Sequence, residues 1–433
     1  MFGLKTLYAR HLSRKGEHAA ALAMCDMKDV FVLSRAGMHL SVLSACSKGN
    51  LELASAKFNV GDIEGALSII RQFRHAREAR PLIGQLAVLI PERILPLALD
   101  HPDLVEIRRY CEIALGRARV GEAAGSLPTP LHSVSQALAE GDSKVARVQW
   151  NKFFSACGVL APEMNWEGGK LDLKHIDCKL AEDAIQRGPL VSIIMTACNE
   201  EAYLETAVRS ILNQTWKNLE LIIVDDCSTD GTNQLAVRLG RQDARIRLVK
   251  LDRNVGTWQS KNVGSELAQG EYITMHDADD WSHPSKILMQ MKPLLSQPKL
   301  MCSSSNFVRV QQETGALFTR NACSYMRWNP SSLLYRRAVL LELGGYHPDL
   351  VGGDCEYAAR IETRWDRRVH AVIRKPLSLG WQRTGSLSNR FRGPEDVKYR
   401  LQQWEQWRTA HAAACTRRDM SLLRASKTTL LQA

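Results

Sequence analysis

The 433-residue sequence has no apolar run long enough to cross a bilayer. Its most apolar stretch, "QLAVLIPERILPLAL", is interrupted by Pro91, Glu92 and Arg93. The first sixteen residues, "MFGLKTLYARHLSRKG", lack the apolar core of a signal peptide. They are typical of the first helix of a helical domain, and a basic helix lying on a membrane surface is the alternative.

Paired cysteine motifs are also missing. The chain has eleven cysteines, none in a CxxC motif and no two at the spacing of a metal site. An odd number of scattered cysteines in a long chain is typical of reduced thiols rather than of a disulfide framework. We therefore expect a cytoplasmic protein, with peripheral contact at the inner face of the membrane as a further expectation.

Glycine-rich phosphate loops are absent, since the sequence has neither GxGxxG after its first expected strand nor GxxxxGK[ST] anywhere. It also lacks zinc-finger spacing and aromatic RNA-binding signatures, so no nucleic acid partner is expected. The chain has 57 Lys and Arg against 46 Asp and Glu, a formal net charge of +11. This excess favours anionic partners such as nucleotides or an acidic membrane, and ordinary solubility charge is the alternative.

Residues 1–160 are predicted to form an all-α domain. Ile63, Ala66, Leu67 and Ile70 have the spacing of one helix face. A glycine–acid step recurs in "GEHAAAL", "GDIEGAL", "GEAAG" and "GDSKVA", where glycine ends one helix and the acid suits the start of the next. The pattern resembles a degenerate tetratricopeptide-like repeat, which would bind a protein partner or brace a neighbouring domain. A helical cap without a ligand is equally compatible with it.

Residues 161–188 are interpreted as a linker, and an α/β domain is predicted for residues 189–390. Apolar strands at 191–195, 219–224, 246–250 and 271–275 alternate with helical patterns. This alternation predicts a mostly parallel, Rossmann-like sheet covered by helices. Residues 391–433 form a tail whose "RLQQWEQWRTAHAAACTRR" predicts a basic amphipathic helix. We expect that helix to pack on the α/β domain, with membrane contact as the alternative.

Polar side chains follow each predicted strand of this domain. Ligands of open parallel sheets bind beyond the carboxyl ends of the strands, so these side chains should converge there. Carboxylates brought together repel one another, and Mg²⁺ or Mn²⁺ shared with a diphosphate would relieve the repulsion. The candidates, strand by strand, are Thr196, Cys198, Asn199, Glu200 and Glu201; Asp225 and Asp226; Asp252, Arg253 and Asn254; and Asp277, Asp279 and Asp280.

Three stretches resemble glycosyltransferase family 2 enzymes of the GT-A fold. They are "VSIIMTACNEEAYLETAVRSILNQTWKNLELIIVDDCSTDGT", "DRNVGTWQSKNVGSELAQGEYITMHDADD" and "LGGYHPDLVGGDCEYAARI". The resemblance covers roughly residues 188–390, less than half of the chain. It implies a nucleotide-sugar donor, first of all a UDP-sugar, and a glycan or lipid-linked acceptor.

The resemblance also implies roles for individual residues. Asp277 and Asp279 would belong to a DxD motif that binds Mn²⁺ or Mg²⁺, and Asp354 would be the general base. The remaining donor-site residues would be Thr196, Asn199, Glu200, Asp225, Asp226, Arg253, Lys261, Asp280 and, in the closing segment 381–388, Arg383, with Ser386 touching phosphate or acceptor.

Two positions depart from the family pattern, and the first is Cys198, where the family often has tyrosine. Cysteine stands at 227 where the family often has glycine, so the backbone there is expected to differ. Asp354 precedes a helical pattern, so a helix N-cap is an alternative role for it.

The chemistry implied is a single displacement with inversion at the anomeric carbon, serving a polysaccharide, glycolipid or protein glycan. A cation neutralises the diphosphate as it leaves, and a carboxylate takes the proton of the attacking hydroxyl. Two alternatives remain. One is a helical scaffold with an inactive transferase domain. The other is a sugar nucleotidyltransferase, which would need a glycine-rich basic loop after the first strand.

Overall fold

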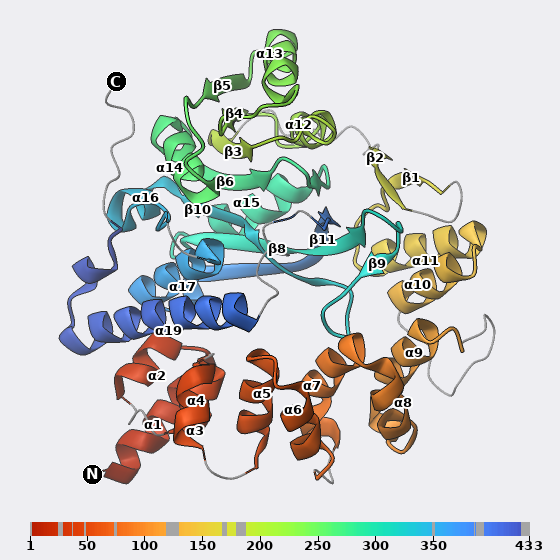
Figure 1. Cartoon of the computed structure of the whole chain (residues 1–433). Helices are drawn as coiled ribbons and strands as arrows, with labels where there is room; N and C mark the ends of the chain where they lie inside the picture. Colours follow the sequence, from red (N-terminus) through yellow and green to blue (C-terminus); the bar gives the residue numbers. More distant parts are fainter. Residues whose placement is uncertain are drawn as a thin grey trace.

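A computed structural model describes residues 2–24, 29–36, 38–46, 49–72, 76–117, 130–166, 171–178, 188–348, 351–384, 386 and 394–425. Its N-terminal part is entirely helical and forms an arc along one edge of the molecule (Figure 1). The helices are α1 (Phe2–Lys15), α2 (His18–Met24), α3 (Val30–Arg35), α4 (His39–Ala45), α5 (Leu51–Asn59), α6 (Ile63–Ile70), α7 (Ala76–Leu89), α8 (Pro91–Leu99), η1 (Pro102–Leu104), α9 (Val105–Ala114), α10 (Pro130–Ala139) and α11 (Ser143–Ala156).

The predicted glycine–acid turns separate consecutive helices of this arc. Gly61 and Gly141 have φ of +88° and +74°, values that glycine adopts without a steric penalty. Asp62 and Asp142 then cap α6 and α11, because their carboxylates accept hydrogen bonds from Gly65 N and Val145 N. The motif "GEAAG" lies outside the described residues. The helical region is thus confirmed, whereas its tetratricopeptide-like character stays a prediction.

The segment predicted as a linker contains a two-stranded antiparallel hairpin. Its strands are β1 (Glu163–Asn165) and β2 (Asp172–Asp177). The boundaries placed at 160, 188 and 390 stay predictions.

The α/β domain is built on a nine-stranded sheet with the order β5-β4-β3-β6-β10-β8-β11-β7, in which β9 pairs with β8. The four predicted strands form its parallel half, β5-β4-β3-β6. Strand β10 is antiparallel to both of its neighbours, and β8 is parallel to β11. The strands are β3 (Val191–Ala197), β4 (Leu219–Asp225), β5 (Ile246–Lys250), β6 (Tyr272–Asp277), β7 (Trp281–Ser282), β8 (Cys302–Gln311), β9 (Leu317–Phe318), β10 (Arg327–Arg336) and β11 (His370–Gln382).

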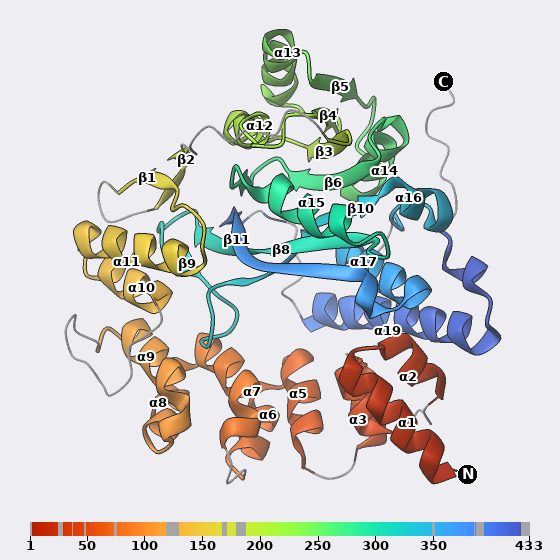
Figure 2. The same ribbon diagram turned by 180° about the vertical axis from the view of Figure 1, so that it is seen from behind.

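Helices cover both faces of this sheet (Figures 1 and 2). Apolar residues of α12, α13 and α15 pack on one face, and those of α16 and α17 pack on the other, where α14 also lies. The helices are α12 (Leu204–Leu212), α13 (Thr232–Gln242), α14 (Thr257–Leu267), α15 (Lys286–Ser296), α16 (Arg337–Leu343), α17 (Gly353–Trp365), η3 (Arg367–Val369), α19 (Pro394–Arg417) and η4 (Met420–Leu423). The predicted fold class, a Rossmann-like α/β domain preceded by an all-α region, is confirmed.

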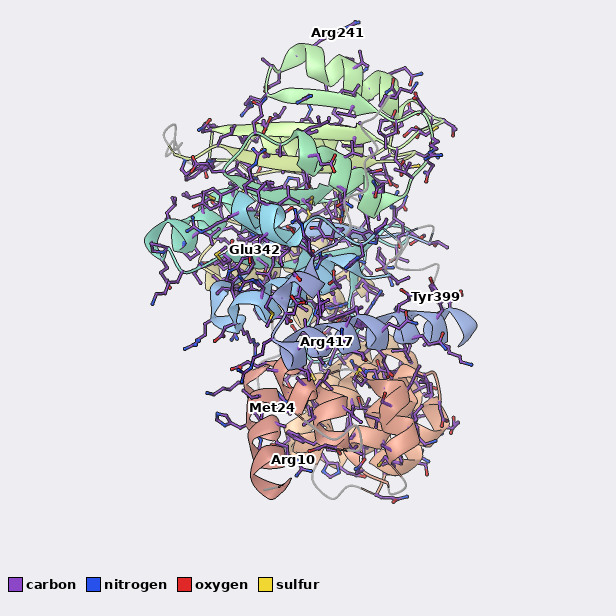
Figure 3. The ribbon with its side chains drawn as sticks, turned by 90° about the vertical axis from the view of Figure 1, so that its left-hand side faces the viewer. Arg10, Met24, Arg241, Glu342, Tyr399 and Arg417 are labelled. Atoms are coloured by element: carbon purple, nitrogen blue, oxygen red, sulfur yellow. The ribbon has the colours of Figure 1, made fainter. Side chains whose placement is uncertain are left out.

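The predicted C-terminal helix, α19, lies between the N-terminal helices and the α/β domain (Figure 3). Its Glu405 accepts hydrogen bonds from the backbone N–H groups of Leu40 (2.6 Å) and Ser41 (3.1 Å) in the first turn of α4. A carboxylate at a helix N-terminus satisfies N–H groups that have no partner within the helix. Helix α19 therefore joins the two parts of the chain. None of the described helices combines the length and apolar character that a bilayer crossing needs.

A buried charge cluster ties α17 to α19. Arg360 donates to both carboxylate oxygens of Glu356 (3.0 and 2.7 Å), and His411 Nε2 lies 2.9 Å from Glu356 Oε1. Burial alone would raise the pKa of Glu356, but Arg360 and His411 lower it to about 2. The carboxylate therefore stays charged inside the protein, and its partners fix the position of α17, the helix whose second residue is Asp354.

Replacing Arg360 with methionine should destabilise the fold by about 3–5 kcal/mol, because Glu356 would remain buried without its main counterion. Arg364→Met on the same helix is the matched control. Arg364 pairs with Glu342 at the surface, and the loss of such a pair costs about 0.2–1 kcal/mol. Urea unfolding of both variants measures the difference. Equal losses would show that the buried cluster does not anchor α17.

Candidate active site

Three carboxylates meet in the turn that follows β6. Asp277 is the last residue of β6, and Asp280 N donates to its carbonyl oxygen (3.1 Å). Asp280 is buried, and Asp277 and Asp279 are partly exposed. Burial raises the pKa of Asp280 well above its ordinary value, and the charges of Asp279 and Asp277 raise it further. The three acids that follow β6 thus lie in one turn, and the convergence of acids from all the predicted strand ends stays a prediction.

Lys261 neutralises one side of this cluster. Its Nζ lies 2.9 Å from Asp277 Oδ1, and its side chain is only 3% exposed. Partial burial would raise the pKa of Asp277, but Lys261 and a hydrogen bond from Ser331 hold it below the ordinary value. Lys261 comes from α14, so this ion pair joins that helix to the end of β6.

Asp354 reaches the same region from the start of α17. Ser331 Oγ donates to Asp354 Oδ2 (3.3 Å). Burial raises the pKa of Asp354, the charge of Asp277 adds to the rise, and Lys261 opposes it. Asp277 and Asp354 thus share Lys261 and Ser331 as neighbours.

The alternative reading of Asp354 as a helix N-cap is wrong. Gly352, with φ of +79°, is the N-cap of α17, and Asp354 lies one residue inside the helix. The carboxylate of Asp354 accepts a hydrogen bond from the backbone N–H of the next residue, Cys355 (2.9 Å), through Oδ1, and one from Ser331 through Oδ2.

Arg383 occupies the other side of the acidic cluster. Its guanidinium donates to both carboxylate oxygens of Glu200 (2.8 and 3.0 Å) and to Asp279 Oδ2 (2.6 Å). It also lies 4.8 Å from the centre of the Tyr203 ring. Burial raises the pKa of Glu200 to about 6 even though Arg383 opposes the rise. Of the segment predicted to close over the donor, 385 and 387–388 lie outside the described residues; Ser386 donates its N–H to Arg383 O.

The two aspartates after β4 hold neighbouring loops. Asp226, 3% exposed, accepts from the backbone N–H groups of Val255 (2.7 Å) and Gly256 (2.9 Å). Asp225 accepts from Ser228 N (3.0 Å) and Asn233 Nδ2 (2.8 Å). Both carboxylates therefore shape the edge of the sheet where a nucleotide is predicted to bind.

The turn after β3 is joined to the turn after β4 by Asn199. Its Oδ1 accepts from Thr229 N (2.8 Å), and its own N–H donates to Ser228 Oγ (3.0 Å). Thr196 Oγ1 lies 3.5 Å from Thr257 Oγ1 at the start of α14. Arg253 is exposed in the loop after β5. The predicted role of each of these residues toward a donor stays a prediction.

Cys227 has φ of +59°, so it keeps the left-handed conformation that glycine would adopt, and the expected backbone difference at this turn is not seen. Its thiol donates to Asp252 O (3.6 Å). Like the other cysteines of the described ranges, it is a free thiol.

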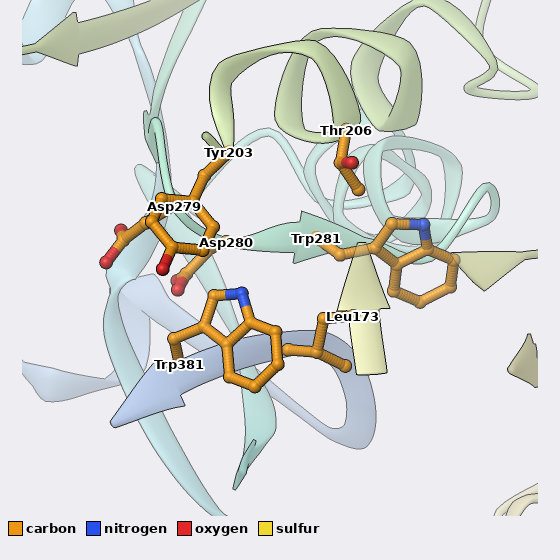
Figure 4. Close-up of a pocket in the computed structure, with 7 residues that line it drawn as sticks. All are labelled: Leu173, Tyr203, Thr206, Asp279, Asp280, Trp281 and Trp381. Atoms are coloured by element: carbon orange, nitrogen blue, oxygen red, sulfur yellow. The ribbon is translucent and has the colours of Figure 1, made fainter. Parts of the chain in front are cut away.

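A small cavity of about 10 Å³ lies against the acids (Figure 4). Its lining residues are Leu173, Tyr203, Thr206, Asp279, Asp280, Trp281 and Trp381. Gly380 of β11 is close to this wall, because a Cβ there would lie 2.6 Å from Asp280 Oδ1. Glycine is therefore required where β11 passes the acidic turn.

Ser331 and Tyr203 are site residues that sequence reasoning missed. Ser331 lies in an irregular part of β10, where the register with β8 shifts between Asn329 and Leu334. No motif surrounds it, so the sequence holds no signal for its contact with Asp354. Tyr203 lies within a motif that the sequence does show, but its position under Arg383 depends on the distant end of β11.

Comparison with known proteins relates most of this site to one sequence family. Residues 192–360 match the sequence model described as Glycosyl transferase family 2. An uncharacterized glycosyltransferase of Haemophilus influenzae is 39% identical over 119 residues, 28% of this chain and 47% of that protein. The putative teichuronic acid biosynthesis glycosyltransferase TuaG of Bacillus subtilis is 38% identical over 109 residues, 25% and 43% of the two chains. The chain thus spans less than half the length of these curated relatives.

Among solved structures, S. aureus TarS 1-349 in complex with UDP-GlcNAc superposes on 53% of this chain and 71% of its own. The sequence identity is 19% and the TM-score is 0.41.

Arg383→Gln should lower the melting temperature in metal-free buffer, because Glu200 and Asp279 would lose their shared counterion. Mn²⁺ should then stabilise this variant more than the unchanged protein, since Arg383 no longer competes for Asp279. Thermal unfolding with and without Mn²⁺ measures both effects. Arg241→Gln, an exposed change on α13, is the control. Identical Mn²⁺ responses in all three proteins would contradict this competition.

Proposed function

We propose that this chain, which carries a glycosyl transferase family 2 domain over residues 192–360, is a metal-dependent inverting glycosyltransferase. It moves a sugar from a nucleotide-sugar, with UDP-sugars the first candidates, to a hydroxyl group of a polysaccharide, glycolipid or protein-glycan acceptor. The observation that carries the proposal is that Asp277 and Asp354 share Lys261 and Ser331 as neighbours, next to Asp279 and Asp280 in the turn after β6.

The residues present fit a divalent cation bound together with a diphosphate. Asp277 and Asp279 each offer carboxylate oxygens, which Mg²⁺ and Mn²⁺ prefer. Burial raises the pKa values of Asp279 and Asp280, and the charge of Asp277 raises both further, so a cation placed here would relieve repulsion between the carboxylates. Within the described ranges no three potential ligand side chains form a complete metal site. A cation bound here would therefore take its remaining ligands from the substrate. Such a cation would neutralise the charge that develops on the departing diphosphate.

The chain's own groups supply the rest of the donor site. Asp225 and Asp226 fix the loops at the edge of β4, where the base and ribose would lie. Lys261 and Arg383 hold opposite sides of the acidic cluster, so each places a positive charge beside the position of the diphosphate. Release of Arg383 from Asp279 would open that carboxylate to the cation and free the guanidinium for phosphate.

Asp354 is proposed as the general base. It must accept the proton of the acceptor hydroxyl as that oxygen attacks the anomeric carbon from the face opposite the diphosphate. Its raised pKa strengthens it as a proton acceptor, and Ser331 orients the carboxylate through the 3.3 Å hydrogen bond. Because the base and the leaving group stand on opposite faces of the sugar, the configuration at the anomeric carbon is inverted.

The first test is a panel of nucleotide-sugars with Mn²⁺, followed by thermal unfolding. A ligand present at 100 times its Kd stabilises the folded state by about 2.7 kcal/mol, enough for a measurable rise in melting temperature. A UDP-sugar should give the largest rise, and the rise should require Mn²⁺. If no nucleotide-sugar stabilises the protein, the helical scaffold with an inactive domain becomes the better account.

The second test is Asp354→Asn. Transfer should fall by about 10²- to 10⁴-fold, the usual contribution of a general base, while donor binding in the thermal assay is retained. Asp366→Asn, just beyond the other end of α17, is the control and should leave transfer unchanged. Normal turnover by Asp354→Asn would rule out the base assignment.

A further inference from the structure

Two arginines lie on the sheet face that carries the acidic turn. In β8, Arg309 is in register with Gly380 of β11, the glycine that passes Asp280. In β10, Arg327 is in register with Phe307, two residues before Arg309. Paired residues and residues two apart share a face of a sheet, so Arg309 and Arg327 point to the same side. The Arg309 guanidinium lies 5.0 Å from the centre of the Phe307 ring, as this arrangement requires.

Neither arginine has an acidic partner in an ion pair within the described part of the chain. Arg309 donates one hydrogen bond, to Gln382 Oε1 (2.9 Å), and its buried Nε has no partner there. The backbone of Arg327 pairs with β8, but its side chain makes no hydrogen bond to a described residue. Burial lowers the pKa of Arg327, and the charge of Arg309 lowers it further. Two neighbouring guanidinium groups that are half-buried and make no ion pair within the described residues indicate a binding position for an anion.

Arg327 lies within electrostatic range of the first turn of α17, the turn that contains the proposed base. Burial raises the pKa of the thiol of Cys355, the residue after Asp354, and the charges of Arg408 from α19 and of Arg327 oppose the rise. Burial raises the pKa values of Asp279 and Asp280, and the charge of Arg309 opposes the rise at both carboxylates. The two arginines therefore extend from the acidic turn toward the first turn of α17. The donor diphosphate is assigned to Lys261 and Arg383, so the pair near Asp354 lies on the acceptor side.

We propose that Arg309 and Arg327 bind a phosphate group of the acceptor, next to the hydroxyl that receives the sugar. A planar guanidinium matches phosphate oxygens through two parallel hydrogen bonds, and partial burial strengthens them. The acceptor class is then a phosphorylated polyol or sugar, free or as a lipid headgroup. This inference rests on the proposed function and names the acceptor class for the same site.

The test measures binding of glycerol 3-phosphate, with glycerol as the uncharged comparison, by calorimetry in the presence of UDP and Mn²⁺. UDP and Mn²⁺ occupy the donor position, so the probe reports on the acceptor side. Glycerol 3-phosphate should bind, glycerol should not, and Arg327→Gln should weaken binding of the phosphate at least tenfold. Arg374→Gln, an exposed arginine of β11, should bind as the unchanged protein does. Arg327→Lys should give an intermediate affinity, because it keeps the charge and loses the paired hydrogen bonds.

Stability provides an independent readout. Because Arg327 has no counterion, Arg327→Gln should leave the melting temperature unchanged or raise it. A fall would instead assign Arg327 to an ion pair within the fold and would overturn the proposal. Equal phosphate affinity in Arg327→Gln and the unchanged protein would overturn it as well, as would the absence of any binding.

Two further measurements distinguish a lipid-bound from a free acceptor, and a failure of this inference from a failure of the proposed function. Vesicles of phosphatidylglycerol, compared with phosphatidylcholine, should bind only if the phosphate site accepts a lipid headgroup, whereas binding of glycerol 3-phosphate alone assigns a free acceptor. Thermal stabilisation by UDP-sugar and Mn²⁺ is measured on the same samples. If the donor binds and glycerol 3-phosphate does not, the acceptor inference fails alone; if the donor does not bind, the proposed function fails.

Discussion

The structure depends on balancing the electrostatic repulsion among carboxylates that lie close together at the end of β6. Asp277, Asp279 and Asp280 follow one another within four positions, and Asp280 is removed from water. Such groups repel one another strongly when water no longer screens them. Lys261 and Arg383 approach the cluster from opposite sides and supply the compensating charge. The rest of the domain can be understood as the support that holds these two cations and their acids in place.

That support extends well beyond the α/β domain. Helix α17, which presents Asp354, is fixed by the buried Glu356–Arg360 pair and by His411 of α19. Helix α19 in turn caps α4 of the N-terminal arc through Glu405. The N-terminal helices therefore contact the proposed catalytic helix through one intermediate helix. Their role as a brace for the site has a structural basis, and a role in binding a protein partner stays a prediction.

Sequence reasoning succeeded where the signal is local. The four parallel strands could be predicted because each is a short apolar run bounded by polar turns. The positions of the acids after β4 and β6 then follow from where those strands end. The turns between helices at Gly61 and Gly141 could be predicted for the same reason, because a glycine that ends one helix and an acid that caps the next are adjacent in the sequence.

What sequence reasoning missed depends on contacts between distant segments. The ion pair of Arg383 with Asp279 joins residues 104 positions apart, and the contact of Ser331 with Asp354 arises in an irregular part of β10. The hairpin β1–β2 was expected to be a linker because its strands are short and polar. Asp226 was recognised as important, but its bonds to the 255–256 backbone appear only once the loops meet.

The central claim is that the acidic cluster exists to hold a divalent cation with the diphosphate of an activated sugar. Anomalous diffraction from crystals grown with Mn²⁺ and UDP tests it most directly. The account predicts a manganese peak bridging Asp277 or Asp279 and the diphosphate, with Arg383 withdrawn from Asp279. A manganese ion bound elsewhere, with the Arg383–Asp279 pair intact and UDP remote from the cluster, would contradict it.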